Sequence, residues 1–419
     1  MPNRTSTMVA SVEPNVRHLT AVMPMPKRTG PIRSNWPTYA EDEVAAVADI
    51  LRSGRVNALH HGERCRAFEA AFAARCERAH AIAVANGTLA LELALRALGL
   101  GPGDEVIVPA RSFVASASCV VTVGATPIFA DVDPDSQTLN ASTIAAVLTP
   151  RTRAIIVVHL AGWPAPMDEI MTLADALGIL VVEDCAQAHG ATWDGHPVGS
   201  FGAAAAFSFC TDKIISTGGE GGLLLLRDSE AWQCAWAFKD HGKAPAQEPA
   251  QPNNGQFRWL HRSVGSNYRM TEMQAGIGLL QLGKLDRWVA ARNRNAAILN
   301  RHLAASPAIR TVLPPAPIVN AYYKYYAFVR PDRLRSGWSR DRILATLIAR
   351  GIPAGCGICP EIYREQAFVG TSSAPLARLR VSKMLGETSL MLPCDQTLDV
   401  ADVERMARTV ESVMSKASY

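Results

Sequence analysis

The sequence lacks any long uninterrupted apolar segment. Its richest apolar run, AAAAFSFC, has only eight residues, whereas a membrane-spanning helix needs about 20. We therefore expect no contact with a membrane. The first residues, MPNRTSTMVASVEPNVRHLT, also lack the continuous apolar core of a secretory signal and are expected to form a flexible tail.

Cysteine usage and charge argue against two further classes, disulfide-stabilised proteins and nucleic acid-binding proteins. The nine cysteines are odd in number and scattered, so a disulfide framework is not expected and a reduced, cytoplasmic setting fits better. Cys356 and Cys359 form a CxxC without a second pair of metal ligands nearby, so we expect a loop there and no metal. The 42 basic residues nearly balance 38 acidic ones without a basic stripe, which argues against a nucleic acid partner.

Short apolar runs alternate with helical patterns from about residue 66 to residue 285. Continuous apolar strands separated by helices are typical of an α/β fold with a doubly wound, mostly parallel sheet covered on both faces. The seven runs are AHAIAVA, DEVIVPA, TPIFADV, RAIIVVHL, ILVVEDC, AAAAFSFC and GGLLLLR.

We predict three parts in the chain: an N-terminal arm over 1–35, a large domain over 36–296 and a smaller C-terminal α/β domain over 297–419. The strand-like AYYKYYAFVR and the helical patterns SRDRILATLIARG and DVADVERMARTVESVMSKA indicate the smaller domain. The segment 243–257, rich in Pro, Gln, Ala and Asn, predicts a surface loop.

Two helices have boundaries that the sequence suggests. Thr38 and Glu41 have the spacing of a capping box, which predicts a helix start just after Pro37. One long helix is predicted from Thr271 through Arg294.

One lysine and one carboxylate carry the chemical hypothesis. Lys213 lies in a Ser/Thr/Gly-rich turn after an apolar run, and Asp184 ends another run. A sheltered lysine can form a Schiff base with an aldehyde, and an aspartate is the usual partner of a pyridinium nitrogen. Together they predict a pyridoxal phosphate site, although a lone lysine in a turn is more often a surface residue.

Other residues that follow strands suit the remaining parts of this cofactor. The amides of Gly87 and Thr88 would open a helix and form an anion site, joined by the hydroxyl of Ser208. Phe113 could stack on the ring and Gln187 could bond its hydroxyl. These residues also have structural interpretations. The turn with Gly87 and Thr88 could be a plain helix cap, the Ser208 hydroxyl could bond the backbone at a strand end, and Phe113 could be a core residue. Because parallel strands end at one edge, these residues are expected to converge.

Two histidines are ambiguous at this point. His159 follows a strand and could line the substrate site, and His189 could orient Asp184. A histidine satisfied inside the structure is at least as common a reading for both.

With these motifs assembled, the chain resembles the DegT/DnrJ/EryC1/StrS sugar aminotransferase family of fold-type I pyridoxal phosphate enzymes. The resemblance extends from about Pro37 to Met414 and rests on ANGTLALELAL, PARSFVASAS, FADVD, VHLAGWPAPMDEI, VEDCAQAHGA, FSFCTDKIISTGGEGG, GSNYRMTEMQAGIGLLQL and GIPAGCGICPEIY.

The resemblance implies roles for individual residues. Lys213 would carry the Schiff base. Asp184 and Gln187 would contact the ring nitrogen and hydroxyl, Phe113 would stack on the ring, and the phosphate would be held by Gly87, Thr88 and Ser208.

The motif SNYRM implies a further contact. The asparagine matching Asn267 reaches the phosphate of a neighbouring subunit in this family, which implies a homodimer with shared active sites. Arg269 would support that contact or only brace the loop.

The resemblance also limits the reaction. Members that dehydrate sugars carry His in place of the lysine, so Lys213 favours transamination from L-glutamine or L-glutamate to a cyclic ketone. The stretch GCGICPEIYREQAF is similar to the branch that aminates ketocyclitols such as scyllo-inosose, and nucleotide-linked keto-sugars are the alternative. Tyr363 in this stretch could line the acceptor pocket or simply pack within the small domain.

Two other classes remain as alternatives. A nucleotide-binding oxidoreductase would need a G-x-G-x-x-G turn after the first strand, where this chain has ANGTLA. A catalytically silent pyridoxal phosphate protein is disfavoured because Lys213, Asp184 and Ser208 are all retained.

Overall fold

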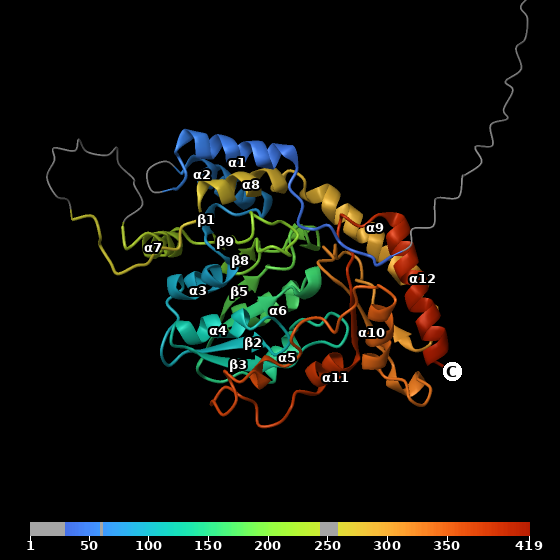
Figure 1. Cartoon of the computed structure of the whole chain (residues 1–419). Helices are drawn as coiled ribbons and strands as arrows, with labels where there is room; N and C mark the ends of the chain where they lie inside the picture. Colours follow the sequence, from blue (N-terminus) through green and yellow to red (C-terminus); the bar gives the residue numbers. More distant parts are fainter. Residues whose placement is uncertain (1–29, 59–61, 244–258) are drawn as a thin grey trace, which may run out of the picture. The chain divides into compact units, whose positions relative to one another are not determined.

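The computed structural model describes residues 30–58, 62–243 and 259–419 (Figure 1). Most of the predicted arm and residues 244–257 of the predicted loop lie outside the described residues.

All seven apolar runs form strands of one sheet. Its order is β1-β9-β8-β5-β4-β2-β3. Neighbours from β8 to β3 are parallel, while β9 is antiparallel to both β1 and β8. The predicted mostly parallel α/β sheet is therefore confirmed. The strands are β1 (His80–Val84), β2 (Glu105–Pro109), β3 (Thr126–Ala130), β4 (Thr152–Val158), β5 (Leu180–Asp184), β8 (Ala204–Ser208) and β9 (Gly222–Leu226).

Helices cover both faces of this sheet. On one face pack α3 (Gly87–Ala97), α4 (Ala115–Thr122) and α7 (Ser229–Lys239). The other face is covered by α2 (Glu63–Arg75), α8 (Glu272–Leu282), α5 (Ala141–Ala145) and α6 (Met167–Leu177).

Strand β9 shows why the runs are apolar throughout. Leu224 and Leu226 enter the core on one face, while Leu223 and Leu225 enter the core on the other. Successive strand side chains point to opposite faces, so a strand buried on both sides has no polar positions.

A second, antiparallel sheet lies in the C-terminal part of the chain. It has the order β10-β11-β12, formed by β10 (Ile309–Arg310), β11 (Tyr325–Val329) and β12 (Ser389–Leu392). Its core is shared with α9 (Leu285–Leu303), α10 (Arg340–Ala349) and α12 (Val400–Ala417), and Figure 1 places α10 and α12 to the right of the large sheet. The smaller elements are a β6 (Thr192–Trp193) and β7 (His196–Pro197) hairpin, α11 (Arg380–Thr388) and the 3-10 turns Leu160–Gly162, Pro331–Arg333 and Ile362–Arg364.

The predicted start of the first helix was wrong. Helix α1 spans Glu41–Ser53 and is capped at Ala40, not Thr38. The carboxylate of Glu43 accepts the amide of Ala40 and also pairs with Lys284 at 2.7 Å. This buried pair fixes the start two residues beyond the expected cap.

The single helix predicted over 271–294 was also wrong. Thr271 caps α8, which ends at Leu282, and a new helix, α9, begins at Leu285. The helix is interrupted at Gly283, because glycine is among the poorest helix formers. The predicted domain boundary at 296/297 falls inside α9, while residues 31–419 form one compact unit. The division into domains stays a prediction.

Candidate active site

The first part of the site is a narrow junction between α3 and β8. Asn86 caps α3 by accepting the amide of Leu89 at 3.0 Å, and helix geometry leaves the amides of Gly87 and Thr88 without intrahelical acceptors. A Cβ on Gly87 would lie 2.6 Å from the Cβ of Ser208. Only glycine allows this approach, which brings two amides of a helix N-terminus beside a hydroxyl. This arrangement fits a phosphate.

The carboxylate of Asp184 lies at the end of β5, in register with Ala206 of β8. It is buried, and it accepts hydrogen bonds from the Ser116 hydroxyl at 2.8 Å and the Ala186 amide at 3.2 Å. Burial raises the pKa of Asp184, while these hydrogen bonds and the charge of Lys213 oppose the rise. A desolvated carboxylate of this kind gains stability from a protonated ring nitrogen placed beside it.

Lys213 lies in the turn between β8 and β9. Its amide bonds the carbonyl of Cys210 at 3.0 Å, and its carbonyl accepts the indole N–H of Trp36 at 2.7 Å. Its Nζ lies 4.9 Å from the ring centroid of Tyr323. Its positive charge opposes the rise in the pKa of Asp184.

Two further predicted contacts lie around Asp184. The ring of Phe113 is 58% exposed, three residues from Ser116, which itself bonds both Asp184 and Ser112. An uncovered aromatic ring at this position is available for stacking. The carbonyl oxygen of Gln187 accepts the amide of Ala161 at 2.8 Å, which leaves its amide nitrogen as the group that could donate to a ring hydroxyl.

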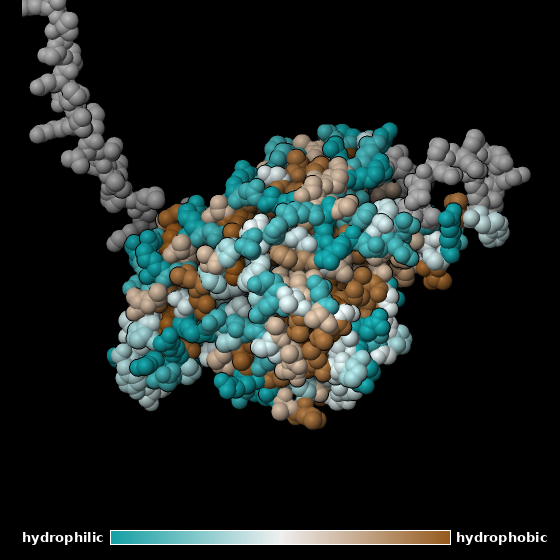
Figure 2. All heavy atoms as spheres, turned by 180° about the vertical axis from the view of Figure 1, so that it is seen from behind, coloured by the Kyte–Doolittle hydropathy of each residue, from teal (hydrophilic) through white to brown (hydrophobic). Residues whose placement is uncertain are grey.

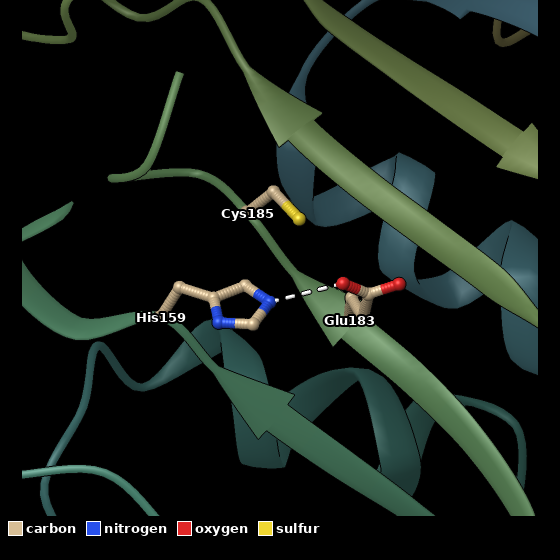
Figure 3. A group of neighbouring side chains, drawn as sticks. All are labelled: His159, Glu183 and Cys185. Atoms are coloured by element: carbon tan, nitrogen blue, oxygen red, sulfur yellow. Dashed lines mark hydrogen bonds and ion pairs between the residues drawn. The ribbon is translucent and has the colours of Figure 1, made fainter. Parts of the chain in front are cut away.

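His159 belongs to a buried support beneath the site, shown in Figure 3 with Glu183 and Cys185. Its Nδ1 accepts the amide of Ala165 at 3.0 Å, so the proton is on Nε2, which donates to Glu183 at 3.1 Å. Both ring nitrogens are therefore occupied by hydrogen bonds, and neither is available to bind a metal or a substrate. His159 is therefore a satisfied structural histidine.

The carboxylate oxygens of Glu183 are likewise occupied by hydrogen bonds. Its oxygens also accept the amides of Gly199, Phe201 and Gly202. Although burial favours its neutral form, the hydrogen bonds from His159 and these amides lower its pKa below the ordinary value. Burial raises the pKa of the neighbouring Cys185 thiol. Because His159 and Glu183 are committed to these hydrogen bonds, they join the ends of β4 and β5 to the segment before β8 and do not suit a metal ion.

His189 does not orient Asp184. Neither of its ring nitrogens has a hydrogen-bond partner among the described residues. The ring lies between those of Phe207 and Phe209, with centroid distances of 5.5 and 5.6 Å. Burial, with a smaller contribution from the charge of Lys213, lowers the pKa of His189 to about 3, so the ring is neutral.

Asn267 and Arg269 lie on a segment that runs beside the end of β1, where Ala85 donates to the carbonyl of Tyr268 at 2.9 Å. Arg269 pairs with the buried Asp240 at 2.6 Å, so its guanidinium braces this segment. The side chain of Asn267 is exposed and contacts only the amide of Arg269, at 3.4 Å, within the described part of the chain.

Tyr363 is packed in the core. Its ring lies edge-on to Phe129 with a centroid distance of 5.8 Å. Its hydroxyl donates to Glu361 and accepts the amide of Leu379 at 2.9 Å. These contacts favour packing over a place in an acceptor pocket, but the ring packs against β3 of the large sheet and not within the small domain as expected.

Three residues that contact the site did not emerge from the sequence: Ser116, Trp36 and Tyr323. Ser116 had a local signal, because it follows Ser112 by one helical turn and their hydroxyls bond at 2.9 Å. Trp36 and Tyr323 come from distant parts of the chain, and no local spacing connects them with Lys213.

Comparison with known proteins identifies the family. Residues 37–411 match the DegT/DnrJ/EryC1/StrS aminotransferase family. This chain belongs to that family. It is therefore a pyridoxal phosphate-dependent aminotransferase of fold-type I, and the phosphate cradle and the buried carboxylate described above fit that cofactor.

Individual relatives differ in their acceptors. GDP-perosamine synthase of Caulobacter vibrioides is 38% identical over 350 residues, covering 83% of this chain and 89% of the relative. L-glutamine:2-deoxy-scyllo-inosose aminotransferase of Streptomyces kanamyceticus is 36% identical over 330 residues, covering 78% and 77%. The crystal structure of an aminotransferase from Psychrobacter cryohalolentis superposes with a TM-score of 0.88 at 45% identity, covering 91% of this chain and 99% of that one.

Within the described ranges, every helix is too short or too polar to cross a lipid bilayer.

Proposed function

We propose that this enzyme moves the amino group of L-glutamine or L-glutamate to a cyclic ketone, with a ketocyclitol of the scyllo-inosose type as acceptor. The observation that carries the proposal is that Asp184 ends β5 in register with Ala206, two residues before the Ser208 that meets Gly87, while Lys213 lies in the turn that follows β8. An amine, a carboxylate and an anion site are the three protein groups that pyridoxal phosphate chemistry needs.

The cofactor, when bound, supplies an electron sink and carries the amino group between the two substrates. Asp184 would keep a proton on the ring nitrogen, while Gln187 and Phe113 would orient the ring. The amides of Gly87 and Thr88 with the Ser208 hydroxyl would hold the phosphate. The Nζ of Lys213 would act as base and then acid, taking a proton from the donor carbon and returning it across a short distance.

We also propose a homodimer in which Asn267 completes the phosphate site of the partner subunit. The exposed side chain of Asn267 and its bracing by Arg269 support this role. Apolar residues of the preceding segment are exposed in the single chain, with Val264 at 90% and Leu260 at 52%. Figure 2 shows other apolar residues interspersed among polar ones on the face it presents.

The acceptor class is the finer part of the proposal. The ketocyclitol choice is supported by the stretch GCGICPEIYREQAF and by the scyllo-inosose aminotransferases among the relatives. A nucleotide-linked keto-sugar is the second candidate, because GDP-perosamine synthase is similar at 38% identity.

Transfer of a labelled amino group separates these candidates. The purified enzyme is incubated with pyridoxal phosphate, L-glutamine or L-glutamate carrying ¹⁵N on the α-amino group, and either scyllo-inosose or a nucleotide-linked 4-keto-sugar. We expect the label in an aminocyclitol and its absence with Lys213→Ala. Label only in the sugar nucleotide would favour the second candidate. Loss of water from the sugar without label transfer, or no reaction with either donor, would contradict transamination.

A further inference from the structure

Tyr323 contacts the turn that carries Lys213 in two ways. Its ring centroid lies 4.9 Å from the Nζ of Lys213, and its hydroxyl donates to the carboxylate of the adjacent Asp212. We propose that Tyr323 is a positioning residue that holds the protonated amine of Lys213 at the site between the two proton transfers. This rests on the role of Lys213 given above.

The ring is well suited to hold an ammonium group. Tyr323 is buried, and a cation–π contact is stronger on a desolvated aromatic face than on an exposed one. Burial and the neighbouring Asp212 raise the pKa of the phenol, so the ring stays neutral. No carboxylate lies within ion-pair distance of Lys213 in the ranges that the structure describes. The ring is therefore the local partner of the charged amine.

The backbone of Tyr323 is fixed relative to the rest of the site. Its amide donates to the carbonyl of Ala161 at 2.9 Å, and the amide of Ala161 donates to Gln187 at 2.8 Å. Its own carbonyl accepts the buried Arg292 at 3.1 Å. Tyr323 therefore connects the lysine turn to the residue that we expect at the ring hydroxyl.

The hydroxyl and the ring of Tyr323 have separable effects. The hydroxyl fixes the turn through Asp212, whose side chain is exposed, while the ring acts on the amine itself. Losing the ring would leave the four-carbon side chain of Lys213 free among many rotamers. The proton-transfer rate would then fall more than the affinity for the donor.

The experiment compares Tyr323→Leu, Tyr323→Phe and Asp212→Ala with the parent enzyme. Stopped-flow absorbance follows the reaction of pyridoxal phosphate with the apoenzyme and the donor half-reaction with L-glutamine or L-glutamate. Binding of pyridoxamine phosphate, which cannot react with Lys213, reports on the rest of the site. Tyr325→Phe and Lys324→Gln serve as controls, because Tyr325 bonds Asn300 and Lys324 is a second cation 4.8 Å from the Tyr323 ring.

We expect Tyr323→Leu to slow both reactions about 10-fold, consistent with the strength of a buried cation–π contact. The KM for the donor and the Kd for pyridoxamine phosphate should stay within about twofold. Tyr323→Phe keeps the ring and, like Asp212→Ala, removes only the bond between the hydroxyl and the Asp212 carboxylate. Both variants should therefore lose about threefold, and both controls should match the parent.

Three results would overturn the proposal: unchanged rates in Tyr323→Leu, equal weakening of pyridoxamine phosphate binding, or the same slowing in Lys324→Gln. If Tyr323→Leu does not fold, the proposal fails when the surface variant Asp212→Ala and Tyr323→Phe both react at the parental rate. Failure of the function itself has a different signature, because Lys213→Ala would then still react with pyridoxal phosphate.

Discussion

The hydroxyl of Ser116 donates a hydrogen bond of 2.8 Å to Oδ2 of Asp184 and so joins the first turn of α4 to the end of β5. This bond favours the ionised carboxylate, whereas burial, the larger effect, raises the pKa of Asp184. The site therefore depends on Ser116 to keep the charge that a ring nitrogen requires.

Ser116→Ala is expected to raise the pKa of Asp184 further, because a hydrogen bond to the charged form is lost. The acid limb of the kcat/KM profile should therefore move to higher pH. Ser118→Ala on the same helix is the control. An acid limb at the parental pH in a folded Ser116→Ala variant would show that this bond does not tune the carboxylate.

Gly87→Ala is expected to weaken cofactor binding at least 10-fold, because the added methyl group would lie 2.6 Å from the Cβ of Ser208. The helix start and the hydroxyl would have to separate, which opens the phosphate site. Gly101→Ala is the control, since its Cβ would meet only a carbonyl oxygen at 3.8 Å. A fluorescence titration with pyridoxal phosphate measures both, and equal affinities would contradict the cradle.

Asn267→Ala tests whether the active sites are shared. In a hybrid dimer of Lys213→Ala with Asn267→Ala, a contact across the interface puts both defects in one site and leaves the other intact. Mixing the two inactive or weakened variants under subunit exchange should then restore activity. If Asn267 acted within its own subunit, each hybrid site would carry one defect and mixing would restore nothing.

Glu69 should make stability depend on pH. Burial raises its pKa from 4.5 to about 7, while the Ala83 amide opposes the shift. Between these values the unfolded chain releases the proton that the folded chain keeps. Stability should therefore fall as pH rises through this window and level off above pH 7, by at most about 3 kcal/mol.

Glu69→Gln keeps an oxygen for the Ala83 amide, which Glu69 accepts at 2.8 Å, and removes the titration. Urea unfolding at pH 5, 6, 7 and 8 should give a flatter profile for this variant than for the parent. Parallel profiles would show that Glu69 does not carry the pH dependence.

The sheet was predictable because its signal is local. Each of the seven strands is a short run such as ILVVEDC, buried on both faces and bounded by polar or glycine residues. The error in the predicted start of the first helix arose because the start of α1 depends on contacts that are not local. It depends on the pair of Glu43 with Lys284, which are far apart in the sequence.

The residues of the candidate site also fall into two groups, those with a local sequence signal and those placed by long-range contacts. Lys213, Asp184, Gly87 and Ser208 each stand at the end of a recognisable element, and the fold brings them to one edge. Trp36 and Tyr323 were not found, because tertiary packing sets their contacts with Lys213. Ser116 was missed although its spacing from Ser112 gave a local signal. His159 and His189 show that a histidine after a strand does not reveal its role until its neighbours are known.

Covalent labelling identifies the lysine that carries the cofactor. The enzyme is saturated with pyridoxal phosphate, reduced with borohydride and digested, and mass spectrometry locates the pyridoxyl group. We expect a modified peptide containing Lys213, and we expect protection of Lys213 when L-glutamine or L-glutamate is added before reduction. A pyridoxyl group on another lysine, or none after full reconstitution, would contradict the assignment of Lys213 and the function built on it.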